Sequence, residues 1–437
     1  MESDKTLSPE DYKRLLSIDW NLWTEDELSQ FLVWDFLNAF SKMGLAKDIV
    51  KTAEAESGIF LKKYKKYIFI FKIIDKLFQK TFSILGWKKT LKKIYFQNIS
   101  LKFTPLIRAA QKYYSIGIIV QGKKDRLFAI KNFINYIGTT DLNQCVHDYL
   151  ANKDTKNLYN LVEKAEDRLK VAKPDFIIFG LDVLPIERAI ILAARKMSIP
   201  TIVIQDGVYD SNFPLFECNV ADYILFWGEH FKDLWISRNK KRPENSYVLG
   251  YPYLINKNYE LKTNDSHLVC YLGQDFERYN RDNLIPKLET IKAIYEICKN
   301  LGLKFIYRPH PGDDRAYLSK NLLDVQFTRE DEKIEESLNR ADIFISLNST
   351  ALIEAAMRSK IALQLMDFPI KSDNLEELGV CNKSFKTIEE LENYLGKIAG
   401  ASDMNRFKLR YNNDYIETRY EPGRRFLEIM KEIEKNK

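Results

Sequence analysis

Several residue types and signature motifs are scarce or missing in this chain of 437 residues. It has no Gly-x-Gly-x-x-Gly fingerprint and no complete Walker loop, in which Ser or Thr follows Gly-x-x-x-x-Gly-Lys. Their absence argues against dehydrogenase and nucleoside-triphosphatase functions. No Asp-x-Asp pair occurs, so a metal-bridged diphosphate is not indicated, and we expect neither a metal nor a cofactor. Only 17 glycines and 13 prolines are present, which argues against long disordered linkers.

Cysteines are few and show no paired spacing, which predicts free thiols in a reducing compartment rather than disulfides or a zinc site. They are Cys145, Cys218, Cys270, Cys298 and Cys381. The start, Met-Glu-Ser-Asp-Lys, lacks the basic-then-apolar pattern of a secretory signal peptide. No apolar run approaches the roughly 20 residues that a membrane-spanning helix needs. Together these absences predict a cytoplasmic protein.

Positive charge is unevenly distributed, although the net charge of +6 is mild. Residues 60–93 hold eleven lysines and one acid, Asp75. Apolar residues recur there at three- and four-residue steps, which predicts a helix with one apolar face. Such a helix is suited to the anionic inner face of the plasma membrane, and equally to packing on a domain with its lysines solvated. Nucleic-acid binding is disfavoured because no nucleic-acid motif accompanies the charge.

The length and the alternation of strands with helices predict more than one α/β domain. A chain this long exceeds one ordinary core, and 45% apolar with 29% charged residues fits a globular protein. Residues 1–90 are predicted to be a helical extension. Two Rossmann-like domains with parallel, doubly wound sheets follow at 91–257 and 265–437, facing each other across a cleft.

Three predicted strand ends carry polar residues, and ligands of open parallel sheets bind outside the carboxyl ends of strands. Gln205-Asp206-Gly207 ends a strand in the first of these domains. Arg308-Pro309-His310-Pro311 and Asn348-Ser349-Thr350 end two strands in the second. A reaction between a donor in the second domain and an acceptor in the first would occur in the cleft.

The hydroxyls of Ser349 and Thr350 precede an apolar helix whose first N–H groups suit a phosphate. A plain N-cap is the alternative. Glu354 lies too far along that helix for a capping box, so we assign it to the two ribose hydroxyls, with a partly exposed helix acid as the alternative. Asn348 and Gln274 are assigned to the same nucleotide site.

His310 lies between two prolines, which stiffen the turn that presents it. A histidine there can donate to a phosphate oxygen and neutralise charge on a departing nucleotide, so we assign it a catalytic role as well as nucleotide binding. Pro311 is assigned to the same site. Arg308 either adds positive charge to the site or pairs with an acid such as Asp313 or Asp314.

Asp206 is the candidate general base, because the following glycine lets the backbone turn and expose the carboxylate. An ordinary Asp-Gly turn is the alternative interpretation. Glu187 and Asp210 are weaker candidates for the base. The residues assigned to the acceptor side are Gln205, Gly207 and His230.

These motifs resemble those of GT-B-fold glycosyltransferases over roughly residues 91–437, above all those of bacterial surface-polysaccharide synthesis. The sialyltransferase, polysialyltransferase and Kdo-transferase branches carry an acidic-acidic-Gly motif, a His-Pro motif and a Ser-Ser/Thr motif. Here Gln205-Asp206-Gly207, His310-Pro311 and Ser349-Thr350 are similar to them, with Gln205 where an acid is usual. The resemblance implies that Asp206 is the base and that the other two motifs bind a CMP-linked donor.

The sequence therefore predicts a metal-independent, inverting glycosyltransferase. It would move a sugar from a nucleotide donor, CMP-linked in our prediction, to a glycan or lipid-linked acceptor. The stretches Ile-Pro-Thr-Ile-Val-Ile-Gln-Asp-Gly and Leu-Gly-Tyr-Pro also resemble CDP-glycerol glycerophosphotransferases and UDP-GlcNAc 2-epimerases. A polyol-phosphate transferase or an epimerase is thus one alternative. A non-catalytic scaffold that binds glycan or membrane is another.

Overall fold

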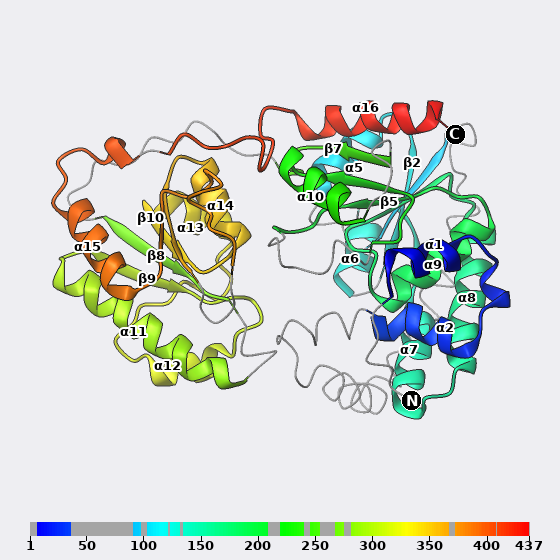
Figure 1. Ribbon diagram of the computed structural model, residues 1–437, viewed down its shortest axis with the longest axis horizontal. Helices are drawn as coiled ribbons and strands as arrows, with labels where there is room; N and C mark the ends of the chain where they lie inside the picture. The colour runs from blue at the N-terminus through cyan, green and yellow to red at the C-terminus, as the bar shows by residue number, and fades with distance from the viewer. Residues whose placement is uncertain are drawn as a thin grey trace. The chain divides into compact units, whose positions relative to one another are not determined.

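The structure is a computed structural model, drawn in Figure 1, and its described residues divide into two compact units. Unit 1 combines Met1–Asp206, Phe213–Leu254 and Arg419–Lys437, and unit 2 combines Gly207–Asn212 and Ile255–Thr418. The described residues are 7–35, 91–97, 103–120, 123–131, 134–208, 219–239, 245–253, 267–274, 281–366, 372–407 and 409–436. Residues 60–90 of the predicted basic helix lie outside them.

Unit 1 is built on a seven-stranded sheet in the order β3-β2-β1-β4-β5-β6-β7, with every neighbouring pair parallel. Its strands are short apolar runs rich in Ile, Val and Phe, as expected for a parallel sheet that is covered on both faces. The strands are β1 Lys93–Gln97, β2 Ser115–Val120, β3 Asn135–Gly138, β4 Phe176–Phe179, β5 Thr201–Ile204, β6 Tyr223–Phe226 and β7 Ser246–Val248.

The helices of unit 1 alternate with these strands, so the α/β class predicted from the sequence is confirmed. They are α5 Thr104–Ala110, α6 Lys123–Lys131, α7 Thr140–Asn152, α8 Lys156–Ala172, α9 Pro185–Lys196, α10 Glu229–Asn239 and α16 Pro422–Lys435. Helices α7 and α8 pack together, and α8 packs on α9.

The last helix of the chain, α16, belongs to unit 1, where it packs beside α5 (Figure 1). Its apolar face contributes to the same core as the strands, through Phe426, Ile429, Met430 and Ile433. The domain boundaries predicted from the sequence placed this helix in the second domain, at 265–437. That assignment is wrong, because α16 packs in the core of unit 1. The amphipathic pattern of the helix predicts that one face is buried, but it does not identify the core that buries it.

The described N-terminal residues also pack on unit 1. Helices α1 (Pro9–Leu16) and α2 (Glu25–Ser29) each begin with a capping box, and a π-helical turn at Gln30–Trp34 follows α2. The indole N–H of Trp20 donates to Glu166 (3.1 Å), and that of Trp34 donates to Tyr149 (2.9 Å). Residues 7–35 are therefore part of this unit, although the sequence assigned them to a separate extension.

Unit 2 is built on a five-stranded parallel sheet in the order β12-β11-β10-β8-β9. Its strands are β8 Leu268–Leu272, β9 Lys304–Arg308, β10 Ile343–Ser346, β11 Ile361–Leu365 and β12 Lys383–Phe385. Its helices are α11 Leu284–Asn300, α12 Arg315–Asn321, α13 Ile334–Arg340, α14 Thr350–Met357 and α15 Ile388–Ala399. Between α12 and α13 the chain adds a single parallel bridge between Phe327 and Tyr307.

The order of strands in unit 2 reverses between β8 and β10. From β8 the chain passes through α11 to β9 on one side, and then crosses to β10 on the other side. This reversal is the topological switch point, where open parallel sheets bind ligands at their carboxyl edge. The residues that follow β8 and β10 are therefore the ones to consider first.

No helix in the described ranges is long and apolar enough to cross a bilayer.

Candidate functional site

The loops that follow β8 and β10 are tied to each other at the switch point. The backbone N–H of Asn348 donates to the Gln274 side-chain oxygen (2.9 Å), and the Gln274 amide donates back to the Asn348 carbonyl. The Ser346 hydroxyl adds a bond to the Leu272 carbonyl (3.0 Å). From the sequence, Gln274 was assigned to nucleotide binding. In the structure its side chain holds the backbone of Asn348, which directly precedes Ser349 and Thr350.

Ser349 is the N-cap of α14, and its hydroxyl oxygen accepts the N–H of Ala351 (3.2 Å). The capping interpretation considered from the sequence is therefore realised at Ser349. The Thr350 hydroxyl oxygen accepts the N–H of Val208 (3.4 Å), which lies in the short Gly207–Asn212 part of unit 2. Glu354 is half-buried in the middle of α14, whereas its neighbours Ile353 and Ala355 are fully buried.

The turn that carries His310 is held by the buried carboxylate of Asp313, which the sequence suggested only as a possible partner of Arg308. Asp313 accepts from the Lys287 ammonium (2.7 Å), the Tyr307 hydroxyl (3.0 Å) and the His310 backbone N–H (2.9 Å). Its side chain is fully buried, and that of Lys287 nearly so. The turn is thus anchored to β9 and to α11. A spacing of three residues from His310 is a local signal that could have identified Asp313.

The imidazole of His310 is oriented by its own turn, because its Nδ1 accepts the backbone N–H of Gly312 (3.1 Å). An imidazole nitrogen that accepts a hydrogen bond carries no proton, so the neutral ring holds its proton on Nε2. His310 therefore presents Nε2–H as a donor, which is the form that suits a phosphate oxygen.

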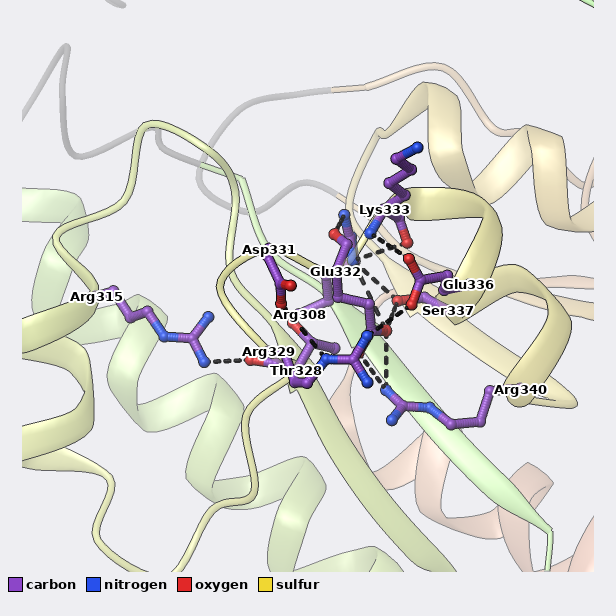
Figure 2. Close-up of polar contacts among 10 residues, drawn as sticks. All are labelled: Arg308, Arg315, Thr328, Arg329, Asp331, Glu332, Lys333, Glu336, Ser337 and Arg340. Carbon is purple, nitrogen blue, oxygen red and sulfur yellow. Dashed lines mark hydrogen bonds and ion pairs between the residues drawn. The ribbon is translucent and has the colours of Figure 1, made fainter.

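Arg308, two residues before His310, is part of the polar network drawn in Figure 2. Its guanidinium donates to the Ser337 hydroxyl (2.9 Å) and to the Glu332 carbonyl (3.0 Å). The buried Glu332 carboxylate also accepts from Ser337 and Arg340. The sequence left open whether Arg308 adds charge to the site or pairs with an acid such as Asp313 or Asp314. The acid beside it is instead Glu332, 3.9 Å away. Much of the Arg308 charge is therefore compensated within unit 2.

At the carboxyl edge of the unit 1 sheet, Gln205 joins two strand ends. Its side-chain oxygen accepts the N–H of Trp227 (2.9 Å), its backbone N–H donates to Leu225 (3.0 Å), and the residue is buried. This binds the end of β5 to the end of β6. Asp206 follows directly and is half-buried, and Gly207 begins the part of the chain that belongs to unit 2.

His230, the second residue of α10, is half-buried and packs edge-on against Phe231. Glu187, the weaker candidate for the base, is buried and accepts from the Gln97 amide (2.6 Å). Asp210, the other weaker candidate, lies outside the described residues.

The thiols within the described residues are buried and free: Cys145, Cys270, Cys298 and Cys381. Burial raises the pKa of Cys270, Cys298 and Cys381 to about 12, so these thiols stay neutral at physiological pH. Among the residues that the structure describes, no group of His, Cys, Asp and Glu side chains is arranged to hold a metal ion.

Gly273 leaves the space in which the Tyr307 hydroxyl meets Asp313. A Cβ at Gly273 would overlap that hydroxyl and lie 3.1 Å from the Arg308 carbonyl. We expect Gly273→Ala to destabilise unit 2 by about 1–3 kcal/mol, as overpacking does. Urea unfolding measures the change.

The matched control for this glycine is Gly396→Ala in α15, where the nearest side-chain atom lies 3.9 Å from the added methyl. It should be neutral or stabilising, because alanine favours helix more than glycine does. Equal stabilities for the two variants would contradict the packing argument at Gly273.

Comparisons with known proteins extend this description. No family model matches the chain, and no curated protein matches it. Among solved structures, the putative UDP-N-acetylglucosamine 2-epimerase from Listeria monocytogenes matches at 13% identity, covering 79% of this chain and 97% of that chain with a TM-score of 0.57. The S. aureus MnaA-UDP co-structure matches at 16% identity, with the same coverage of both chains and a TM-score of 0.55.

A third solved structure, the glycosyltransferase SnogD from Streptomyces nogalater, matches at 11% identity. It covers 78% of this chain and 99% of that chain, with a TM-score of 0.50. Identities this low establish the fold alone. The chain has the GT-B fold, with two Rossmann-like units. Its structural neighbours include both glycosyltransferases and UDP-N-acetylglucosamine 2-epimerases.

Proposed function

We propose that this protein is a metal-independent, inverting glycosyltransferase that uses a nucleotide-linked sugar. The observation that carries the proposal is the arrangement at the edge of the unit 2 sheet. The oriented imidazole of His310 follows β9, and the N-terminus of α14 follows β10, on the two sides of β8. A helix N-terminus and a histidine N–H donor suit the phosphate of a departing nucleotide.

In this mechanism the oxygen of an acceptor hydroxyl attacks the anomeric carbon of the donor sugar while Asp206 takes its proton. The bond between the anomeric carbon and the phosphate oxygen breaks, and the phosphate leaves with the electron pair. His310 Nε2–H, Ser349 and Thr350 bind that phosphate, and Glu354 binds the ribose. A single displacement inverts the configuration at the anomeric carbon.

We propose a CMP-linked donor because His310-Pro311 and Ser349-Thr350 resemble the motifs of transferases that use CMP-sugars. The competing candidate is a UDP-sugar 2-epimerase, which is favoured by the likeness to the Listeria monocytogenes and S. aureus structures. A polyol-phosphate transferase and a scaffold without activity are further candidates. An epimerase converts the nucleotide sugar without an acceptor, so analysis of the products separates it from a transferase.

The decisive experiment is a thermal-shift screen with CMP, CDP, UDP, GDP and dTDP. A nucleotide at one hundred times its Kd should stabilise the folded protein by about 2.7 kcal/mol, which raises the melting temperature by several degrees. We expect CMP to give the largest shift and His310→Ala to abolish it. A largest shift with UDP would favour the epimerase, and the absence of any shift would favour a scaffold.

We also propose a glycan or lipid-linked acceptor. A lipid-linked acceptor would be met at the inner face of the plasma membrane, where the lysines of residues 60–93 would bind anionic headgroups. We expect the protein to cosediment with vesicles that contain phosphatidylglycerol, and to stay in the supernatant with purely zwitterionic vesicles. Equal sedimentation with both would contradict an electrostatic attachment.

A further inference from the structure

Unit 1 contains a pocket of about 470 Å³ between its sheet and the α7–α8 pair of helices. Helices α7 and α8 are labelled in Figure 1. Its polar lining comes from Lys93, Asn135, Asp141, Lys164, Asp167 and Arg168. A volume of this size is in the range of small-molecule sites.

The floor of the pocket is a tyrosine ring that lies across the sheet. Tyr95, Gly117 and Asn135 are register neighbours on β1, β2 and β3. A Cβ at Gly117 would overlap the Tyr95 ring, so glycine is required for the ring to cross β2. Beyond it, the Tyr95 hydroxyl accepts from the Asn135 amide (3.1 Å). Gly117 also starts a Gly-x-x-x-x-Gly-Lys run, but it lies inside a strand, so that run is not a phosphate loop.

Two of the charged groups around the pocket are paired with each other. The Arg168 guanidinium forms an ion pair with Asp141. Asp167 pairs with Lys170, which does not line the pocket (3.2 Å). Both contacts compensate charges on one wall of the pocket, and the first also links α8 to α7.

Lys164 is different, because its half-buried ammonium is bonded to a thiol. The Nζ lies 3.3 Å from Cys145 Sγ, and burial raises the pKa of that thiol, so the sulfur stays uncharged. Across the ranges that the structure describes, no carboxylate lies within ion-pair distance of Lys164 Nζ. The Asp141 carboxylate interacts electrostatically with Lys164, but its bonded partner is Arg168. An ammonium group that is partly removed from water is stabilised most by a directly bonded anion, which these residues do not supply.

The pocket lies toward the edge of the sheet opposite to the proposed reaction site. Lys93 and Asn135 are the first residues of β1 and β3, and Ala172 ends α8 just before β4. Asp206, by contrast, follows the carboxyl end of β5. A ligand in this pocket would thus lie at the other edge of the sheet from Asp206, and its existence does not depend on the proposed activity.

We propose that this pocket is a second ligand site, which binds a small molecule through a phosphate or carboxylate group at Lys164. Lys93 and Arg168 line the same pocket, and the Arg168 guanidinium, although it is paired with Asp141, has further N–H donors for an anion. Charged donors form short, strong hydrogen bonds to such oxygens, and the guanidinium of arginine suits both groups. The Asn135 amide and the rim of α8 would contact the uncharged part of the ligand.

The first test uses the full-length protein without any substitution. Lysine side chains are acetylated by an N-hydroxysuccinimide ester at constant ionic strength, and the sites are quantified by mass spectrometry. Inorganic phosphate and succinate are the probes, which separate the two anion types. We expect one of them to slow acetylation of Lys164 at least fivefold and to leave Lys170 unchanged. Unchanged labelling of Lys164 with both probes would overturn the proposal.

The second test compares Lys164→Gln with Lys170→Gln. Lys170 lies six residues further along the same helix, α8. Calorimetric titration with the protecting probe is done in the His310→Ala background, which weakens anion binding at the proposed nucleotide site. We expect Lys164→Gln to lower the affinity at least tenfold and Lys170→Gln to leave it within twofold. Equal affinities of the two variants for the probe would show that the anion binds elsewhere. This result would not depend on whether the protein is a glycosyltransferase.

Discussion

Asp206→Asn should lower the rate of sugar transfer by about a hundredfold to ten-thousandfold, the usual contribution of a general base. The amide has nearly the same shape as the carboxylate but does not accept the proton of the acceptor hydroxyl. The nucleotide-induced thermal shift should stay at the wild-type value, because the nucleotide is assigned to unit 2. Initial rates with a saturating donor measure the effect.

Glu229→Gln is the matched control, since Glu229 is also an acid that follows a strand of the unit 1 sheet. It is exposed and pairs with Lys232 on the first turn of α10 (3.1 Å), so its substitution should change the rate less than twofold. A wild-type rate for Asp206→Asn would remove Asp206 from the mechanism. A loss of the thermal shift in that variant would indicate a role in nucleotide binding instead.

Arg188→Met should destabilise unit 1 by about 3–5 kcal/mol, the usual result of breaking a buried ion pair on one side. The side chains of Arg188 and Asp35 are both fully buried, with 3.1 Å between nitrogen and oxygen. The guanidinium also donates to the Tyr12 hydroxyl (2.8 Å) and to the Phe31 carbonyl. Methionine replaces the aliphatic part of the arginine side chain but has no guanidinium, so the Asp35 carboxylate stays buried without its countercharge. Urea unfolding at neutral pH measures the difference.

A second arginine of α9 gives the comparison. Arg195 pairs with Asp222 (2.9 Å), and both side chains are about one-third exposed. Arg195→Met should therefore cost less than about 1 kcal/mol, as exposed ion pairs do. If Arg188→Met were no more harmful than Arg195→Met, residues 7–35 would contribute little to the stability of unit 1.

Much of the fold was predictable from the sequence because buried parallel strands are short apolar runs bounded by polar turns. The runs Phe-Ile-Ile-Phe at β4 (Phe176–Phe179) and Thr-Ile-Val-Ile at β5 (Thr201–Ile204) are of this kind. The packing of α16 and of residues 7–35 on unit 1 was not predictable. Periodicity identifies an apolar face but does not identify the distant residues that cover it.

The strand ends were likewise predictable as the place of the candidate site, whereas the partners of individual side chains were not. Gln205 bonds Trp227 and Arg308 bonds Ser337, pairs separated by 22 and 29 residues. Asp313 meets Lys287, 26 residues earlier in the chain. Such pairs depend on which strands are neighbours in the sheet, and a single sequence does not give that order.

The position of α16 has a consequence for the order of events during synthesis. The core of unit 1 includes Phe426, Ile429, Met430 and Ile433, which follow all of unit 2 in the chain. All of unit 2 has been translated once Thr418 is added. Although domains generally fold in order from the N-terminus as they are made, unit 1 completes its core only after all of unit 2 has been translated.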